Sequence, residues 1–183
     1  MDVGGKQRDI AKWSLDEDFR FDDIYNFLTY EDWLEEAYLT VKQNAGAQTA
    51  GVDGETVSDF AEDLEENIRQ LSQQLDSETY DPDPTRRVYI PKGTGEKRPL
   101  SIPTVRDRIV QEALRMLIEP IYESDFSDQS FGFRPGRCTH DSIQVVRWCF
   151  TRHGAYLPWV IDADIKGFFD NVSHRTLEQI LQD

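Results

Sequence analysis

Two stretches in the N-terminal half place apolar residues three or four positions apart, which is the spacing of one face of an α-helix. The first begins at Thr29, which with Asp32 three residues later resembles a capping box, and its stripe is Tyr30, Trp33, Leu34, Ala37, Tyr38 and Val41. The second stripe is Phe60, Leu64, Ile68, Leu71 and Leu75. The glycines of NAGAQTAGVDG (44–54) predict a loop between these two amphipathic helices.

The pattern changes after Pro82 and Pro84, because proline ends a helix. The segments RRVYIPK (86–92) and RPLSIP (98–103) have the composition of short strands, and GTGE (93–96) supplies glycines for a tight turn. We therefore expect a β-hairpin in this region.

Four more elements are expected toward the C-terminus. Thr104 and Asp107 predict the start of a helix that buries Ile109, Val110, Ala113 and Leu117 and ends near Pro120. The stripe Ile143, Val146, Arg147 and Phe150 predicts another helix, which ends near Gly154 and whose start is organised by His140 and Asp141. LPWVIDADI (157–165) is expected to form a strand, and Ser173 to cap a last helix.

The composition allows a folded core, since 38% of the 183 residues are hydrophobic. No run approaches the ~18 apolar residues of a membrane span, and the N-terminus lacks the apolar region of a signal peptide, so a cytoplasmic protein without membrane contact is expected. Cys138 and Cys149 fit no metal-binding spacing and are expected to be free thiols.

The net charge of −15 is unevenly distributed, with −14 on residues 1–80 and −1 on residues 81–183. Residues 86–115 carry eight basic and three acidic side chains, a local charge of +5. This basic segment is either a binding site for an anion or a solvated surface. The acidic excess elsewhere argues against unspecific coating of nucleic acid, and a high-salt host is one explanation for it.

Asp162 and Asp164 alternate within the predicted strand and would share one of its faces. Carboxylate oxygens suit Mg²⁺, which takes one or two protein carboxylates together with phosphate oxygens. The same pair would also fit two exposed acids on a solvated sheet face, or the metal motif of a glycosyltransferase.

Lys92 and Arg98 flank the predicted turn, and a hairpin brings such positions together. Two cations there, with the backbone amides of Gly93 and Gly95, would bind a polyphosphate. Together with a metal-binding aspartate they describe a site for a magnesium-bound triphosphate.

Four segments, in chain order, resemble the group II intron-encoded reverse transcriptases: NAGAQTAGVDG, RRVYIPKGTGEKRPLSIPTVRDRIVQEAL, SFGFRPGRCTHDSI and DIKGFFDNVSH. The resemblance runs from about Ile24 to the C-terminus. It implies an α+β fold with a helical N-terminal extension (1–80), a fingers region with a β-hairpin and helices (81–156) and the start of a palm (157–183), whose reverse-transcriptase sheet is incomplete.

The resemblance also implies roles for single residues. Asp164 matches the first catalytic aspartate and would bind Mg²⁺ together with the carbonyl of Ile165. Phe169 matches the residue beneath the incoming sugar that excludes a 2′-hydroxyl, and simple core packing is the alternative for it. The residues expected to contact the nucleotide are Lys92, Arg98, Arg86, Phe169 and Ile165, and those expected near the RNA template are Arg134 and Arg137, of which Arg134 is equally suited to a structural role. Asp162 does not match the catalytic acid, and Asp170 is expected to brace the turn.

One departure from the family pattern limits this prediction. The family's second pair of catalytic aspartates, in a Tyr-Ala-Asp-Asp hairpin, does not occur in the 183 residues. We therefore expect an RNA-directed DNA polymerase that uses an intron RNA template, a DNA primer, deoxynucleotides and Mg²⁺ once the remaining palm, thumb and maturase portions are supplied in cis or in trans, and no activity from this chain alone. The alternative is a maturase module that binds intron RNA and assists splicing without polymerising. An incomplete sheet would expose apolar surface and favour association, including homo-oligomers.

Overall fold

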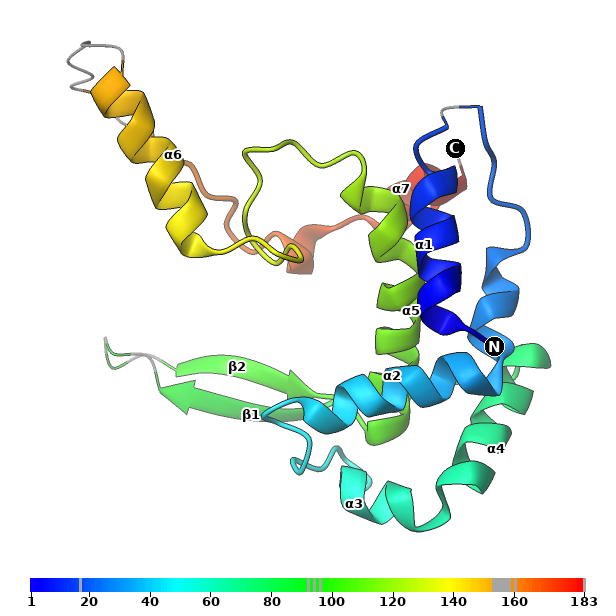
Figure 1. Cartoon of the computed structure of the whole chain (residues 1–183). Coiled ribbons are helices and arrows are strands. Elements are labelled where there is room, and N and C mark those ends of the chain that lie inside the picture. Colours follow the sequence, from blue (N-terminus) through cyan, green and yellow to red (C-terminus); the bar gives the residue numbers. More distant parts are fainter. Residues whose placement is uncertain are drawn as a thin grey trace. The chain divides into compact units, whose positions relative to one another are not determined.

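The computed structural model describes residues 1–183 except for residues 17, 92, 94, 96, 153–158, 160 and 183, and gives only the backbone of residues 152, 170, 181 and 182. The chain divides into two compact units, Met1–Asp128 and Gln129–Asp183, whose elements are labelled in Figure 1. Helices and one two-stranded antiparallel sheet make up the regular structure of the described residues, which confirms the α+β class.

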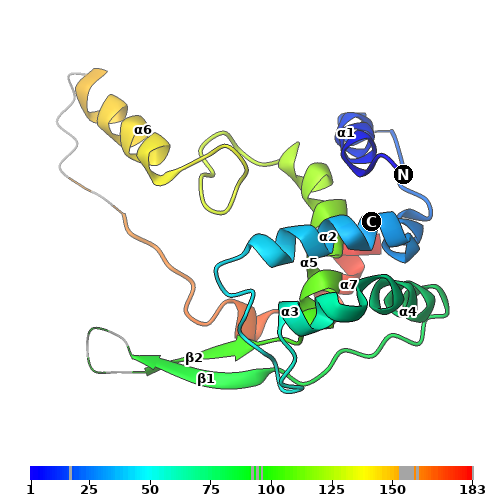
Figure 2. The same ribbon diagram turned by 60° about the horizontal axis from the view of Figure 1, so that its bottom comes forward.

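The first unit is built on four helices, α1 (Val3–Trp13), α2 (Glu31–Gln43), α4 (Leu64–Asp76) and α5 (Val105–Glu123), with the short elements η1 (Ile24–Thr29), α3 (Val57–Phe60) and η2 (Ala61–Asp63). Figures 1 and 2 show α2 crossing α5, and α1 and α4 also pack onto this pair. The core of the unit therefore lies where α2 meets α5.

Trp33 shows how the sequence pattern produces this packing. Its side chain is fully buried on the predicted apolar face of α2, and its indole N–H donates a hydrogen bond to the carbonyl of Ala113 in α5 (3.0 Å). A buried indole without such a partner would lose stability, so the bond fixes how α2 lies against α5. The predicted buried faces are confirmed for Trp33, Leu34, Ala37, Tyr38, Val41, Ile68, Leu71 and Leu75. Two members of the predicted stripes differ: Tyr30 precedes α2 and is exposed, and Phe60 lies in α3 and not in α4.

Two local features, the start of α2 and the presence of α1, differ from the predictions. Thr29 does not cap α2: its hydroxyl donates to the carbonyl of Asn26 at the end of η1, and Tyr30 takes the N-cap position without a side-chain bond. A capping box occurs instead at Thr56 and Asp59, where α3 begins. The prediction that α5 ends near Pro120 is confirmed, because the helix ends at Glu123. Helix α1 was not predicted, because Val3 and Ile10 are its buried residues and two positions do not make a recognisable stripe.

The predicted hairpin is confirmed as β1 (Arg86–Pro91) and β2 (Lys97–Ile102). The two strands are antiparallel, and their register pairs Arg86 with Ile102 at the base and Pro91 with Lys97 toward the turn. Figures 1 and 2 show the hairpin extending away from the helices of the first unit.

The first turn of α5 joins the hairpin to the helical core. The Thr104 hydroxyl accepts a hydrogen bond from the Asp107 backbone N–H (3.3 Å), which confirms the predicted cap. The Asp107 carboxylate is buried and accepts a hydrogen bond from the Tyr80 hydroxyl (2.5 Å). Burial, and then this hydrogen bond, raise the pKa of Tyr80 above its ordinary value.

The loop after α2 is held against the same turn. The guanidinium of Arg108 donates to the carbonyls of Gly46 (3.1 Å) and Thr49 (2.9 Å). Gly51 lies so close to Thr104 that a Cβ on it would be 2.7 Å from the Thr104 Cα and 2.8 Å from its backbone N. Only glycine fits this approach, so the loop and the start of α5 form one rigid element.

The second unit contains α6 (Thr139–Arg152), η3 (Phe169–Asn171) and α7 (His174–Gln182). Asp141 accepts a hydrogen bond from the Cys138 backbone N–H (2.8 Å), and the Ser173 hydroxyl accepts one from Thr176 (3.3 Å), so both predicted helix starts are confirmed. Among the described residues of this unit Arg134 alone is buried. Apolar side chains of α6 such as Ile143 and Val146 are exposed, as expected for an incomplete fold.

The predicted strand at 157–165 is wrong where the structure describes it. Residues 161–165 have no regular structure, and residues 153–158 and 160 lie outside the described part. A strand exists only when its backbone is paired with a neighbour. Within the described residues β1 and β2 pair with each other, and no partner strand stands beside residues 161–165.

None of the helices in the described residues has both the length and the apolar character needed to cross a membrane.

Replacing Gly51 with alanine is expected to lower the free energy of unfolding by about 1–3 kcal/mol, because the added methyl group overlaps the Thr104 backbone. Urea unfolding followed by tryptophan fluorescence measures the change. Gly46→Ala is the matched control in the same loop: a Cβ there meets no atom within 4 Å, so its stability should stay within about 0.5 kcal/mol of the parent. Equal stability of the Gly51 and Gly46 variants would contradict the proposed close approach.

Tyr80→Phe is expected to lower stability by about 1–2 kcal/mol at neutral pH, because the buried Asp107 loses its hydrogen-bond donor. This difference from the parent should shrink above pH ~10, where an unfolded tyrosine ionises while the folded Tyr80, whose pKa is raised, still holds its proton. At Tyr80 the unfolded parent then binds fewer protons than the folded one, so this residue makes the parent lose stability with rising pH, and the phenylalanine variant lacks that contribution. Urea unfolding at a series of pH values tests this, and a difference that stays constant would count against it.

Candidate nucleotide-binding and catalytic site

The hairpin presents two faces, because side chains alternate along a strand and opposite residues of an antiparallel pair share a face. The register places Arg86, Val88, Ile90, Arg98, Leu100 and Ile102 on one face, which we name the Arg98 face. Arg87, Tyr89, Pro91, Lys97, Pro99 and Ser101 lie on the other, which we name the Tyr89 face.

Two of the predicted nucleotide-binding residues, Arg86 and Arg98, share the Arg98 face. Arg98 is opposite Ile90, and Arg86 is four residues before Ile90 on the same strand, so their backbones are about 13 Å apart. The side chain of Arg98 is exposed and forms no hydrogen bond or ion pair with any described residue. Lys92, the other half of the predicted clamp, lies outside the described residues.

Arg86 has a structural contact that the sequence did not reveal. Its Nε–H donates to the carbonyl of Ala50 (3.0 Å), so the base of β1 is tied to the loop that Arg108 and Gly51 hold on α5. The remaining guanidinium nitrogens of Arg86 are on an exposed side chain. The contact of Arg86 with nucleotide stays a prediction, whereas its hydrogen bond to Ala50 is observed and positions the hairpin.

The basic segment 86–115 divides into two groups. Arg106 donates to the side chain of Gln74 (2.5 Å) and lies over the Tyr80 ring, and Arg108 binds loop carbonyls, where burial lowers the pKa of its guanidinium. Arg115 forms ion pairs with Glu112 and Glu119 on its own helix. Arg106, Arg108 and Arg115 therefore stabilise the fold through contacts within the chain. Arg87, Lys97 and Arg98 have no hydrogen-bond or ion-pair partner among the described residues, so the charge available to a ligand is on the hairpin.

The predicted catalytic segment lies in the second unit. Asp164 and Ile165 are exposed in a stretch without regular structure, and a turn follows in which the Asn171 side chain donates to the carbonyl of Gly167 (2.7 Å). Phe169 is 91% exposed and its ring contacts that of Phe168 edge-on at 5.5 Å between centroids. Phe169 therefore does not pack into a core formed by the described residues. The side chain of Asp170 lies outside the described part.

The donors at this segment fit one edge of a magnesium site. Asp164 offers an exposed carboxylate, and Mg²⁺ takes one or two such ligands while keeping water or phosphate oxygens. No three histidine, cysteine, aspartate or glutamate side chains gather to hold a metal ion within the residues that the structure describes. Asp164 would therefore contribute to a site whose other oxygen ligands come from a substrate or from further protein residues.

The two residues expected near the template have different environments. Arg134 is only 8% exposed, and its guanidinium donates to the carbonyl of Ser130 (2.9 Å) within its own turn. Arg137 is exposed, and its guanidinium lies 5.7 Å from the centre of the Phe131 ring. This favours a structural role for Arg134 and leaves Arg137 more accessible.

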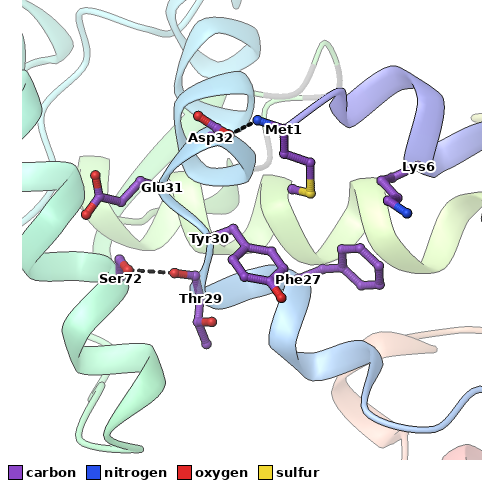
Figure 3. Close-up of a pocket in the computed structure, with 8 residues that line it drawn as sticks. All are labelled: Met1, Lys6, Phe27, Thr29, Tyr30, Glu31, Asp32 and Ser72. Carbon is purple, nitrogen blue, oxygen red and sulfur yellow. Dashed lines mark hydrogen bonds and ion pairs between the residues drawn. The ribbon is translucent and has the colours of Figure 1, made fainter.

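An open pocket of about 690 Å³ lies elsewhere in the first unit, between α1, η1, the start of α2 and the second half of α4. Figure 3 shows its lining, with Ser72 bonded to Thr29 and the Met1 amino group paired with Asp32. None of the residues predicted to bind nucleotide, metal or template lines it.

The chain matches known proteins over most of its length. Residues 90–183 match the family model described as reverse transcriptase (RNA-dependent DNA polymerase). The chain is 42% identical to Protein YkfC of Escherichia coli over 179 residues, which cover 97% of this chain and 47% of that protein. It is 40% identical to the group II intron-encoded protein LtrA of Lactococcus lactis subsp. cremoris over 158 residues, 86% of this chain and 25% of LtrA.

A further match is Nuclear intron maturase 2, mitochondrial, of Arabidopsis thaliana, at 48% identity over 67 residues, 37% of this chain and 9% of that protein. The chain thus spans about half the length of YkfC and a quarter of that of LtrA. The family match covers the β1–β2 hairpin from Ile90 and all of the second unit, including Asp164. On this evidence the chain belongs to the reverse transcriptase family.

Proposed function

We propose that this chain is the N-terminal part of an RNA-directed DNA polymerase of the group II intron type, which extends a DNA primer with deoxynucleotides on an intron RNA template. The observation that carries the proposal is the unpaired guanidinium of Arg98 on an open hairpin face, in a chain that belongs to the reverse transcriptase family. An exposed arginine without an intramolecular partner can offer its fork of N–H donors to a phosphate.

The roles proposed for the nucleotide-binding residues are those that the family resemblance implies. Arg98 and Lys92 bind the triphosphate, and Arg86 adds a cation while it holds the base of the hairpin on the Ala50 loop. Phe169 packs beneath the sugar, where a ring that fills the space of a 2′-hydroxyl selects deoxynucleotides. An aromatic ring exposed at 91% is available for such a contact.

The chemistry would depend on Asp164 and the carbonyl of Ile165, which would hold Mg²⁺. When bound, the metal neutralises the triphosphate and favours attack by the primer 3′-oxygen. Two-metal phosphoryl transfer needs carboxylates from more than one strand, so Asp164 alone is insufficient and the chain by itself is inactive.

The first experiment uses a chimera in which this chain replaces the segment of LtrA that it matches, so that LtrA supplies the rest of the polymerase. With an RNA template, a DNA primer and Mg²⁺, Asp164→Asn should lower primer extension on the order of 10³-fold, because a metal ligand is worth several kcal/mol in the transition state. Asp162→Asn is the matched control, since it removes an exposed charge two residues away and should retain the parent rate. An active Asp164→Asn chimera, or primer extension by the unfused chain, would refute the proposal.

The second experiment measures nucleotide kinetics in the same chimera. Arg98→Ala should raise the KM for deoxynucleotide by about 10- to 100-fold, the value of one or two charge-assisted hydrogen bonds to phosphate. Arg98→Lys keeps the charge but not the fork and should lie between the alanine variant and the parent. An unchanged KM in both variants would remove Arg98 from the nucleotide site and leave the assignment of Asp164 to stand on its own test.

The alternative is an RNA-binding maturase module without polymerisation. The name of one plant relative, Nuclear intron maturase 2, supports the maturase part of it. The charge of −14 on residues 1–80 disfavours it, because an acidic surface repels phosphate. We therefore put polymerisation first.

A further inference from the structure

The outward side of α2 carries a stripe of exposed side chains, on the side of the helix opposite its buried residues. The stripe consists of Glu31, Asp32, Glu35, Glu36 and Leu39, which lie together because residues three or four positions apart are neighbours on a helix. We name this stripe the α2 acidic face. Leu39 is 45% exposed, so an apolar side chain accompanies the carboxylates.

The charge of this face is largely unpaired within the chain. The carboxylates of Glu31, Glu35 and Glu36 form no hydrogen bond or ion pair with any described residue, whereas Asp32 pairs with the Met1 amino group. Glu31 and Glu35 are four positions apart, and like charges at that spacing destabilise a helix. A partner that brings cations to the α2 acidic face would therefore form new ion pairs and relieve a repulsion.

The same face borders a hollow of about 380 Å³. Its lining consists of Met1, Asp2, Val3, Gly4, Asp32, Glu35, Glu36 and Leu39. Carboxylates and an apolar side chain in one lining suit an aromatic residue that is flanked by cations, which is a composition typical of protein interfaces.

The Tyr89 face of the hairpin has the complementary composition. Tyr89 is 60% exposed, and Arg87 precedes it by two residues on β1. Lys97 is two residues from Pro99, the residue opposite Tyr89, so it lies diagonally across the hairpin from the ring. Neither cation forms a hydrogen bond or ion pair with a described residue. Figures 1 and 2 show the hairpin extending away from the helices, so this face is accessible to a second molecule.

We propose that the Tyr89 face of one chain docks on the α2 acidic face of a second copy, with Arg87 and Lys97 facing the carboxylates and Tyr89 entering the hollow. The occupant is a second copy because the chain itself carries both of the complementary surfaces. Both surfaces belong to the first unit, and reciprocal docking of the two hairpins gives a closed dimer. The proposal is independent of the proposed function, since Arg98 lies on the opposite face of the hairpin and Asp164 lies in the other unit.

The first test is sedimentation velocity of the 183-residue chain at about 1–100 μM protein, in ~50 mM and in ~500 mM KCl. We expect a dimer whose dissociation constant rises about tenfold or more at the higher salt, because salt screens ion pairs at an interface. Association through the exposed apolar side chains of α6 would not weaken with salt. A monomer at low salt, a dimer that is insensitive to salt, or assemblies that keep growing with concentration would overturn the proposal.

Charge reversal tests the two surfaces directly. One variant carries Glu35→Lys with Glu36→Lys, and the other carries Arg87→Glu with Lys97→Glu. In each variant alone like charges meet, so the dissociation constant should rise about tenfold or more. An equimolar mixture of the two variants should regain the dimer, because each hairpin then meets a face of opposite charge. A mixture that stays monomeric would contradict the proposed contact.

Matched controls separate this contact from a general effect of net charge. Lys97→Glu should weaken the dimer, whereas Arg98→Glu, on the neighbouring residue but the opposite face, should not. A variant with Glu62→Lys and Glu65→Lys, two exposed residues near the start of α4, should also keep the dimer. Circular dichroism verifies that each variant retains the parent's helix content. An equal loss of association in a control and in its counterpart would overturn the proposal.

Discussion

The close approach of Gly51 to the backbone of Thr104 is the constraint on which the first unit depends. It allows the loop after α2 to lie on the first turn of α5, where Arg108 binds two loop carbonyls and Tyr80 bonds to the buried Asp107. The hairpin leaves this same point, since β2 ends at Ile102 and α5 begins at Val105. Arg86 adds a bond from the base of β1 to Ala50. The hairpin is thus anchored by backbone contacts at its base, while its exposed end carries the cations.

The basic residues of this region have two different roles, and the anchoring of the hairpin explains which residue has which role. A charge of +5 over residues 86–115 suggests one anion site, but the structure uses Arg106, Arg108 and Arg115 for the fold. The N–H donors of buried or paired guanidinium groups already bind carbonyls and carboxylates, so these groups attract a ligand only weakly. The remaining positive charges of this segment lie on the two faces of one hairpin. They offset locally the repulsion of phosphate by a strongly acidic chain.

The parts of the fold that local patterns determine could be predicted from sequence. The stripes of α2 and α4 and the turn residues of the hairpin are visible within a few positions, and Thr104 caps α5 as its sequence indicates. Contacts between distant segments could not be predicted: nothing local shows that Gly51 meets Thr104 or that Arg108 reaches Gly46. The prediction that Thr29 caps α2 is wrong because η1 extends to Thr29. The prediction of a strand at residues 161–165 is wrong because a strand needs a partner as well as a suitable composition.

The two halves of the candidate site differ in how firmly the chain itself holds them. Arg98 is fixed by a ladder of hydrogen bonds between two strands that are anchored on a packed core. Asp164 lies on an irregular segment in a unit where Arg134 alone, among the described residues, is buried, so little apolar burial fixes its backbone. A carboxylate that must hold a metal within a few tenths of an ångström needs such support. The proposed binding of phosphate by the hairpin would therefore require only the first unit, whereas the proposed catalysis would require that further packing or a bound substrate orders the segment around Asp164.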